Sequence, residues 1–288
     1  MRTIVGLAIF CLGISFYACK PADNGERPEA GIALDSLVRR VVIPSHAMEK
    51  VFNAVVILPE TYYLDSTPRF YPVVYLLHGY SGNYANWYER MPELPALASE
   101  HQTIIVTPEG GYSSWYVNSY VDSTEHFFTY ISQEVPSYID GHFRTRPEAT
   151  YRAITGLSMG GHGALSIALQ RPEWFGLAGS MSGVVNLAPY PDKWEIDAQL
   201  GEYTLDSLRW QQHSVMGIAA KPNRNRPHLI IDCGTEDLLV EDNRKLHQLL
   251  SDSQIPHTYI ERPGNHDWLY WQEALPYHLM FFSDRFGK

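Results

Sequence analysis

The stretch from Tyr151 to Ala168 (YRAITGLSMGGHGALSIA) constrains the fold of this chain more than any other. Tyr151 to Ile154 are typical of a short buried strand, Gly156 to Gly160 match the pattern G-x-S-x-G, and an apolar run with helical spacing follows. A strand, a tight turn and a helix in this order are typical of a nucleophile elbow, in which a serine lies at the apex of a strained turn. The pattern predicts that Ser158 precedes a helix whose free N–H groups and positive dipole end face its hydroxyl.

Taken alone, the same five residues would also fit a glycine-rich turn before an ordinary core helix. Glycine and serine are common in loops, so the pattern by itself does not separate a reactive serine from a structural one. The flanking strand and helix favour the reactive serine, because a Cβ at the glycine positions would collide with the neighbouring strand and helix. The decision rests on whether a base and an acid occur elsewhere in the chain.

Apolar runs and helical patterns alternate along the chain. Strands are predicted at 37–43, 51–58, 72–77, 103–107, 151–154, 175–182, 228–233 and 257–260. Helices are predicted at 91–100, 125–139, 164–169, 241–250 and 268–282. Such alternation favours an α/β fold with one mostly parallel sheet and helices on both faces. We expect the first two strands to pair antiparallel at one edge.

The N-terminal segment has the pattern of a targeting signal. Arg2 precedes an apolar run from Ile4 to Tyr17, which is too short to span a membrane, and Ala18 precedes Cys19. A cysteine after a small residue is similar to a bacterial lipoprotein signal, which implies lipidation of Cys19 and a place in the periplasm or cell envelope. Ordinary signal cleavage, a retained anchor and a buried N-terminal element remain as alternatives.

The rest of the chain divides into a linker and one large domain. Residues 1–19 form the predicted signal peptide, and residues 20–35, rich in Pro, Gly and charge, are predicted to be a flexible tether. Residues 36–288 are long enough for one α/β catalytic domain. Within it, residues 183–227 contain no clear strand and are interpreted as a partly helical insertion near the active-site end.

Charge and cysteine content exclude several classes of function. The formal net charge is −10, and no basic cluster is present to neutralise phosphates, which argues against a nucleic acid or an anionic membrane as partner. A membrane association is expected only through the N-terminal anchor. Cys233 is the one cysteine of the domain and has no disulfide partner there, and no cysteine–histidine spacing suggests zinc. We expect neither a metal nor an organic cofactor.

Three residues whose side chains could act together in nucleophilic catalysis each follow a predicted strand. Ser158, Asp237 and His266 each come directly after a strand, and ligands of such sheets bind beyond the carboxyl ends of the strands. A serine hydroxyl is a poor nucleophile until a base takes its proton, and imidazole, with an ordinary pKa near ~6.5, suits this role. A carboxylate would hold the ring in the correct tautomer and stabilise its protonated form.

Other residues compete for the roles of acid and base. The rival acids are Asp232, Glu236, Asp242 and Asp267, and the rival histidines are His78 and His162. Asp232 lies inside a predicted strand, and Asp267 adjoins His266 in sequence, where it can rarely face the ring. Neither rival histidine follows the acid in the chain, so Asp237 and His266 are favoured.

An oxyanion needs two N–H donors, and two backbone groups are placed to supply them. The N–H of Met159 is free at the start of the helix, and the N–H of Tyr80 follows the strand that ends in His78-Gly79. Trp87, Trp115 and Tyr116 would suit an acyl pocket, although ordinary core or loop packing explains them equally well.

Four motifs together resemble the esterase D-like family of α/β-hydrolases. They are His78-Gly79-Tyr80-Ser81-Gly82, Gly156-Leu157-Ser158-Met159-Gly160-Gly161, Gly234-Thr235-Glu236-Asp237 and Gly264-Asn265-His266-Asp267-Trp268. The resemblance covers residues 36–286 and implies Ser158, Asp237 and His266 as catalytic triad, with Tyr80 and Met159 as oxyanion donors. It is greatest to the feruloyl, acetyl-xylan and tributyrin esterase branch. S-formylglutathione hydrolases usually carry cysteine where Gly82 stands, and mycolyltransferases usually carry Asp-Gly where His78-Gly79 stands. Because this sequence departs from both patterns, these two subfamilies are not favoured.

The resemblance implies a serine esterase without a cofactor. Its expected substrate is a feruloyl or acetyl ester of plant polysaccharide, or a short-chain acyl ester. An acyltransferase of the same fold and a binding module without catalysis are the alternatives.

Overall fold

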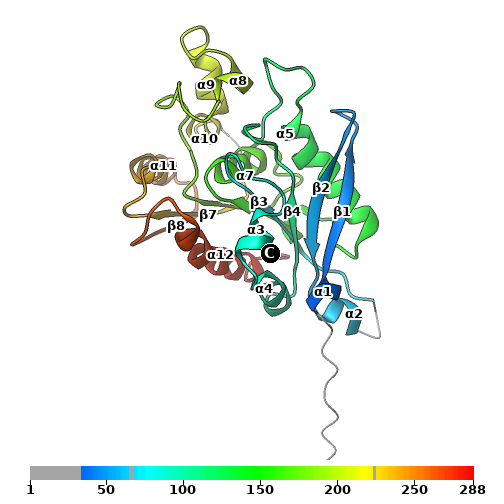
Figure 1. The fold of residues 1–288 in the computed structure, drawn as a ribbon. Helices are drawn as coiled ribbons and strands as arrows, with labels where there is room; N and C mark the ends of the chain where they lie inside the picture. Colours follow the sequence, from blue (N-terminus) through cyan, green and yellow to red (C-terminus); the bar gives the residue numbers. More distant parts are fainter. Residues whose placement is uncertain (1–33, 65–67, 223–224) are drawn as a thin grey trace, which may run out of the picture. The chain divides into compact units, whose positions relative to one another are not determined.

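An eight-stranded sheet forms the centre of the described part of the chain (Figure 1). Its strands are β1 (Val38–Ser45), β2 (Lys50–Ile57), β3 (Val73–Leu77), β4 (Ile104–Pro108), β5 (Arg152–Gly156), β6 (Leu177–Met181), β7 (His228–Gly234) and β8 (His257–Arg262). They lie in the order β1-β2-β4-β3-β5-β6-β7-β8. β2 pairs antiparallel with β1 and β4, and all other pairs are parallel. The predicted mostly parallel sheet with an antiparallel edge pair is confirmed.

The computed structural model describes residues 34–64, 68–222 and 225–288, which belong to one compact unit. The predicted signal peptide with Cys19, and the tether up to residue 33, lie outside the described residues and stay predictions. Within the described ranges, no helix has the length and apolar character needed to cross a membrane.

Helices cover both faces of the sheet. They are α1 (Leu34–Leu37), α2 (Thr61–Leu64), α3 (Asn86–Arg90), α4 (Leu94–Glu100), α5 (Phe127–Thr129), the π-helix η1 (Tyr130–Glu134), α6 (Val135–His142), the 3-10 helix η2 (Ala149–Tyr151), α7 (Met159–Gln170), α8 (Asp197–Leu200), α9 (Ser207–His213), α10 (Val215–Ala219), α11 (Val240–Asp252) and α12 (Trp268–Ser283). Side chains of α3, α4 and α12 form one apolar core with the sheet, and those of α5 to α7 and α11 form the other.

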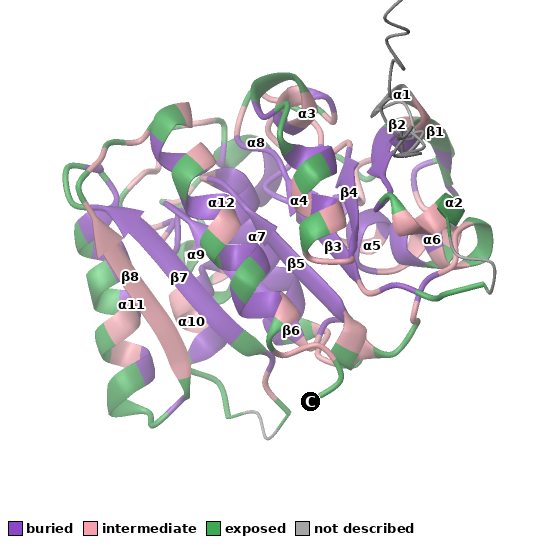
Figure 2. Ribbon diagram, turned by 90° about the horizontal axis from the view of Figure 1, so that it is seen from below, coloured by how far each residue is buried: buried purple, intermediate pink, exposed green. Residues whose placement is uncertain are grey.

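The two cores explain why the central strands are apolar without interruption. In β3, Val73, Tyr75 and Leu77 belong to one core, and Val74 and Leu76 belong to the other. Successive side chains of a strand point to opposite faces, so a sheet covered on both faces needs apolar residues at every position. Figure 2 shows the result, with β5 and β7 buried and the edge strand β8 only partly covered.

Two predicted helices differ from the observed ones, and a proline accounts for each difference. The helix predicted at 91–100 begins only at Leu94 as α4, and the short helix α3, which was not predicted, ends before it at Arg90. Pro92 disfavours helical geometry at Met91, whose φ and ψ are −130° and 79°, and so separates the two helices. The helix predicted at 125–139 contains the π-helical turn η1, because Pro136 has no N–H to donate to the carbonyl of Ser132. The insertion at 183–227 contains α8, α9 and α10, as expected.

The first turn of α7 lies against the end of β3 at a distance that only glycine permits. A Cβ on Gly160 would stand 2.5 Å from the carbonyl oxygen of His78 and 2.6 Å from that of Leu77. A Cβ on Gly156, at the end of β5, would stand 2.7 Å from the carbonyl oxygen of Leu77 and the same distance from the carbonyl carbon of Gly160. These neighbours are backbone atoms, so they cannot rotate away as a side chain could.

Gly160→Ala should destabilise the fold, whereas Gly141→Ala should not. Both glycines lie inside helices, and Gly141 in α6 has no atom within 4 Å of an added Cβ. Overpacking at Gly160 should lower the free energy of unfolding by about 1–3 kcal/mol. At Gly141 the higher helix propensity of alanine should raise the free energy of unfolding by up to about 1 kcal/mol. Urea unfolding of both variants measures the difference, and equal effects would contradict the close approach.

Candidate active site

Ser158 lies in a strained turn between β5 and α7. Its φ of 53° and ψ of −117° are unfavourable for a residue with a side chain. The turn is fixed by hydrogen bonds from the N–H of Ser158 to the carbonyl of Met181 (3.0 Å) and from the N–H of Gly160 to that of Leu157 (2.7 Å). The strand, turn and helix predicted from the sequence are therefore present around this serine.

Ser158, His266 and Asp237 form one chain of hydrogen bonds. His266 Nε2 lies 3.0 Å from Ser158 Oγ, and His266 Nδ1 lies 2.9 Å from Asp237 Oδ2. Asp237 is buried, and its Oδ1 accepts a second hydrogen bond from the N–H of Leu239 (2.8 Å). Because the carboxylate can only accept, it fixes the proton of His266 on Nδ1 and leaves Nε2 able to accept the serine proton.

Each rival acid is bonded to another partner. Asp232 pairs with Arg262 and Tyr270, Glu236 accepts from the N–H of Gly264, Asp242 bonds Tyr190 and Lys245, and Asp267 accepts from the N–H of Tyr270 at the start of α12. None of them contacts the imidazole of His266 through a hydrogen bond within the described residues. The geometry thus favours Asp237 as the carboxylate paired with this histidine.

The two rival histidines have structural partners. His78 Nε2 accepts from the N–H of Gly110 (2.9 Å), so Nδ1 carries the proton and donates to the carbonyl of Gly79 (2.8 Å). This bond holds the loop that carries Tyr80. His162 is fully buried in α7, and its Nε2 donates to the carbonyl of His213 (3.0 Å). Burial lowers the pKa of His162 to about 4, so its ring is neutral near pH 7.

Two backbone N–H groups beside Ser158 are without a hydrogen-bond partner among the described residues. They belong to Tyr80 and Met159, the two predicted donors. The N–H of Met159 is free because it opens α7, where no preceding turn supplies a carbonyl. Two unpaired donors beside a serine hydroxyl can stabilise negative charge on a carbonyl oxygen that the serine attacks.

A cavity of about 550 Å³ opens above Ser158. Its walls include Tyr80, Asn86, Arg90, Trp194, His266 and Trp268. Trp271 also borders it and packs edge-on against the ring of His266, with the centroids 5.0 Å apart. The cavity therefore combines aromatic surfaces with one cation, Arg90, whose guanidinium carbon lies 5.8 Å from the ring centroid of Trp268.

The three aromatic residues predicted to bind substrate lie behind this cavity. Trp87, Trp115 and Tyr116 are at most 1% exposed, and none of them lines the cavity. Their polar atoms donate to backbone carbonyls: Trp87 to Leu77, Trp115 to Trp194, and Tyr116 to His78. They support the walls from within.

Sequence reasoning missed two residues of the walls. Trp194 lies in the insertion, where no motif surrounds it, and Trp268 ends the motif around His266 without a predicted role in binding. Trp268 is half-buried: its ring packs on Trp87 at 5.1 Å and also faces the cavity. Its place in this motif, two residues after His266, was the signal that could have located it.

Cys233 is buried, and burial raises the pKa of its thiol far above the ordinary value. A protonated, inaccessible thiol is a poor nucleophile. Among the residues that the structure describes, no group of three or more His, Cys, Asp or Glu is placed to hold a metal ion.

Comparison with known proteins gives consistent results. A family model described as "Putative esterase" matches residues 45–282. An acetyl esterase of Caldicellulosiruptor saccharolyticus is 29% identical over 216 residues, which cover 70% of this chain and 79% of that protein. A fluorophosphonate-binding serine hydrolase of Staphylococcus aureus has a TM-score of 0.77 at 25% identity, covering 85% of this chain and 98% of the other. A ferulic acid esterase has a TM-score of 0.74 at 26% identity, covering 87% and 98%.

Two buried histidines should make the fold less stable in mild acid. Burial lowers the pKa of His162 to about 4 and that of His278 to about 3. In the unfolded chain both would bind protons below about pH 6.5. Their stabilising contribution is therefore complete above about pH 6.5 and is lost as the pH falls toward 4. The loss should be on the order of 1 kcal/mol per pH unit for each histidine.

Urea unfolding at about pH 7 and about pH 5 measures this dependence. His162→Gln should show a smaller loss of unfolding free energy between the two conditions than the wild type. His142→Gln, a change at an exposed position of α6, should retain the full loss. If both variants lose the same amount, His162 does not contribute to the acid sensitivity.

Proposed function

The chain belongs to the putative esterase family and is a carboxylic ester hydrolase with an α/β-hydrolase fold, and from this premise we propose that it acts through an acyl-enzyme on Ser158. The hydrogen-bonded chain of Ser158, His266 and Asp237 is the observation that carries the proposal. A base at 3.0 Å from the serine hydroxyl, oriented by a buried carboxylate, is what activation of this weak nucleophile requires.

In the proposed reaction, His266 Nε2 removes the proton of Ser158 as Oγ bonds to the carbonyl carbon of the ester. The carbonyl oxygen becomes an oxyanion, which accepts hydrogen bonds from the N–H groups of Tyr80 and Met159. Asp237 stabilises the imidazolium. His266 then gives its proton to the departing alkoxide as the carbon–oxygen bond breaks, leaving an acyl group on Ser158. Water repeats the sequence with the same groups and releases the acid.

The proposed substrates are acetyl or feruloyl esters of plant polysaccharide, or other short-chain acyl esters. The aromatic surfaces of Tyr80, Trp194 and Trp268 support this choice, since flat apolar rings suit a small acyl chain or an aromatic acid. The acetyl esterase and the ferulic acid esterase among the similar proteins support it further. The open side of the cavity leaves room for an alcohol that is part of a larger molecule.

Ser158→Ala should abolish hydrolysis of every ester that the wild type cleaves. The panel would run from p-nitrophenyl acetate through longer acyl chains to methyl ferulate and acetylated xylan. Without the nucleophile, kcat should fall by at least about 10⁴-fold. The acyl group with the highest kcat/KM identifies what the pocket accepts.

Ser166→Ala is the matched control, because Ser166 lies on the same helix two turns beyond Ser158. Its activity should stay within about twofold of the wild type, in keeping with small effects away from the chemistry. Residual activity of Ser158→Ala close to the wild type would refute the acyl-enzyme. If folded wild-type protein cleaves no ester of the panel, an acyltransferase or a binding module takes the place of the proposed function.

Asp237→Asn should lower kcat by about 10⁴-fold, the size of the effect known for the equivalent change in a serine protease. The amide would present a donor to His266 Nδ1 and favour the wrong tautomer. Asp267→Asn is the control, since Asp267 adjoins the histidine but caps α12 through the N–H of Tyr270. Steady-state kinetics on p-nitrophenyl acetate compares the two. A loss below tenfold for Asp237→Asn would move the role of the acid to another residue.

A further inference from the structure

A second cavity lies at the opposite end of the sheet from Ser158. It has a volume of about 830 Å³, and its lining comes mainly from the segments that lead into β3, β4 and β5, with Ser283 at the end of α12 and Phe286 after it. Ser158 follows the carboxyl end of β5, whereas Tyr151 of the cavity precedes its amino end. A strand of five residues spans roughly 17 Å, so a ligand in one cavity does not reach the other.

The cavity lining holds two arginines, Arg69 and Arg146, and two acids, Asp140 and Glu148, in a chain whose net charge is −10. Arg69 Nη1 donates to the neutral amide oxygen of Gln102 at 2.9 Å and forms no ion pair with a described carboxylate. Arg146 stands 4.0 Å from Glu148, and both side chains are largely exposed, so this pair contributes little. Asp140, the other acid of the lining, is already paired with Arg152 at 2.6 Å. Two guanidinium groups are thus available to an anion.

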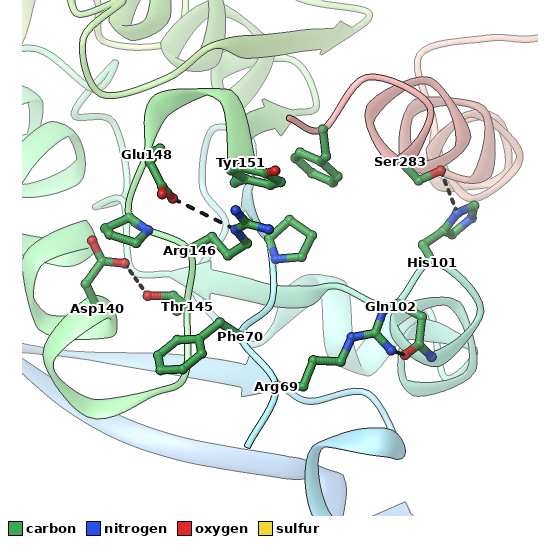
Figure 3. Close-up of a pocket in the computed structure, with 13 residues that line it drawn as sticks. Arg69, Phe70, His101, Gln102, Asp140, Thr145, Arg146, Glu148, Tyr151 and Ser283 are labelled. Atoms are coloured by element: carbon green, nitrogen blue, oxygen red, sulfur yellow. Dashed lines mark hydrogen bonds and ion pairs between the residues drawn. The ribbon is translucent and has the colours of Figure 1, made fainter. Parts of the chain in front are cut away.

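Flat apolar surfaces stand beside these cations. Phe70 is 58% exposed, and Tyr151 and Phe286 complete the aromatic part of the wall. The guanidinium carbon of Arg146 lies 3.6 Å from the centroid of the Tyr151 ring, a stacked position that leaves its N–H edges free for a ligand. Figure 3 shows Arg146 between Glu148 and Tyr151, with Arg69 and Gln102 on the other side of the pocket.

We propose that this cavity, here called the basic aromatic pocket, binds an acidic oligosaccharide through a sugar ring that bears a carboxylate. Arginine binds carboxylates through two parallel hydrogen bonds, and an exposed ring such as Phe70 packs against the apolar C–H face of a sugar. The second N–H of Gln102 Nε2 supplies a donor for a hydroxyl group, since the first donates to the carbonyl of Ser99 and Oε1 accepts from Arg69 and Thr61. The volume exceeds that needed for a single ring and lies within the range of small-ligand sites.

The pocket would hold a carbohydrate chain without taking part in its hydrolysis. The proposal does not depend on the reaction at Ser158, because binding can be measured without turnover. It differs from the catalytic cavity in its chemistry, since the carboxylate is recognised by Arg69 and Arg146. The hydroxyl of Ser283 lies 3.2 Å from His101 Nδ1, but the elbow geometry around Ser158 is not repeated there: Ser283 is the last residue of α12 and donates to the carbonyl of Met280.

Isothermal titration calorimetry of the purified full chain tests the proposal. Trigalacturonate is the acidic probe, xylotriose the neutral probe and 4-hydroxycinnamate the aromatic acid without a sugar. Trigalacturonate should bind, and Arg146→Gln or Arg69→Gln should weaken it by at least about tenfold, the usual effect of losing a charged hydrogen bond. Phe70→Ala should weaken it about fivefold. Xylotriose should bind at least about tenfold more weakly than trigalacturonate.

Arg40→Gln is the matched control, since it removes the same charge from an exposed position of β1 outside the pocket. It should leave trigalacturonate binding unchanged, and all four variants should hydrolyse p-nitrophenyl acetate as the wild type does. Absence of trigalacturonate binding, or binding that Arg146→Gln and Arg40→Gln affect equally, overturns the proposal. Arginine-dependent binding of 4-hydroxycinnamate alone also overturns it, because the ligand would then be an aromatic acid.

Discussion

The contact between the first turn of α7 and the ends of β3 and β5 is the constraint on which the site depends. Gly156 and Gly160 allow backbone atoms to approach where any Cβ would collide. This approach holds Ser158 at a positive φ, with its hydroxyl within hydrogen-bond distance of His266. The strain at one residue is sustained because strands on both sides and a buried helix determine the position of the turn.

The base and the acid are placed by a second set of backbone contacts. The N–H of Thr235 donates to the carbonyl of Arg262 (2.8 Å), and the N–H of Glu236 donates to that of Gly264 (3.0 Å), so the loops after β7 and β8 are joined. Below them, Arg262 pairs with the buried carboxylate of Asp232 at 2.8 Å. The separation of Asp237 and His266 is therefore set by the main chain and by a buried ion pair, which limits how far the imidazole can move relative to Ser158.

Much of the fold and the central part of the site could be predicted from the sequence, because their signals are local. Apolar runs in the sequence predicted every strand of the sheet. The glycines around Ser158 predicted a tight turn that few other residues can form. The order of strands, with β4 between β2 and β3, leaves no such trace, since it depends on contacts between distant segments. The aromatic residues that line the catalytic cavity were harder to predict than the strand order. Trp115 and Trp194 look alike in sequence, and only tertiary packing makes one a support and the other a surface.

Side chains of the loop after β4 and of α7 hold the insertion by donating hydrogen bonds to its carbonyl groups. Trp115 donates to the carbonyl of Trp194, and His162 donates to the carbonyl of His213. Every residue carries a carbonyl, so these attachments place no demand on the side chains of the insertion itself. Exchange of the ring at position 194 would remove its packing on Trp115 and Tyr190, but the hydrogen bond to the carbonyl of residue 194 does not depend on the side chain there. The carbonyl groups that hold the insertion and the side chains that line the cavity are thus different parts of the segment. Substitutions in the cavity wall can therefore change which ester is preferred while Ser158, His266 and Asp237 stay in place.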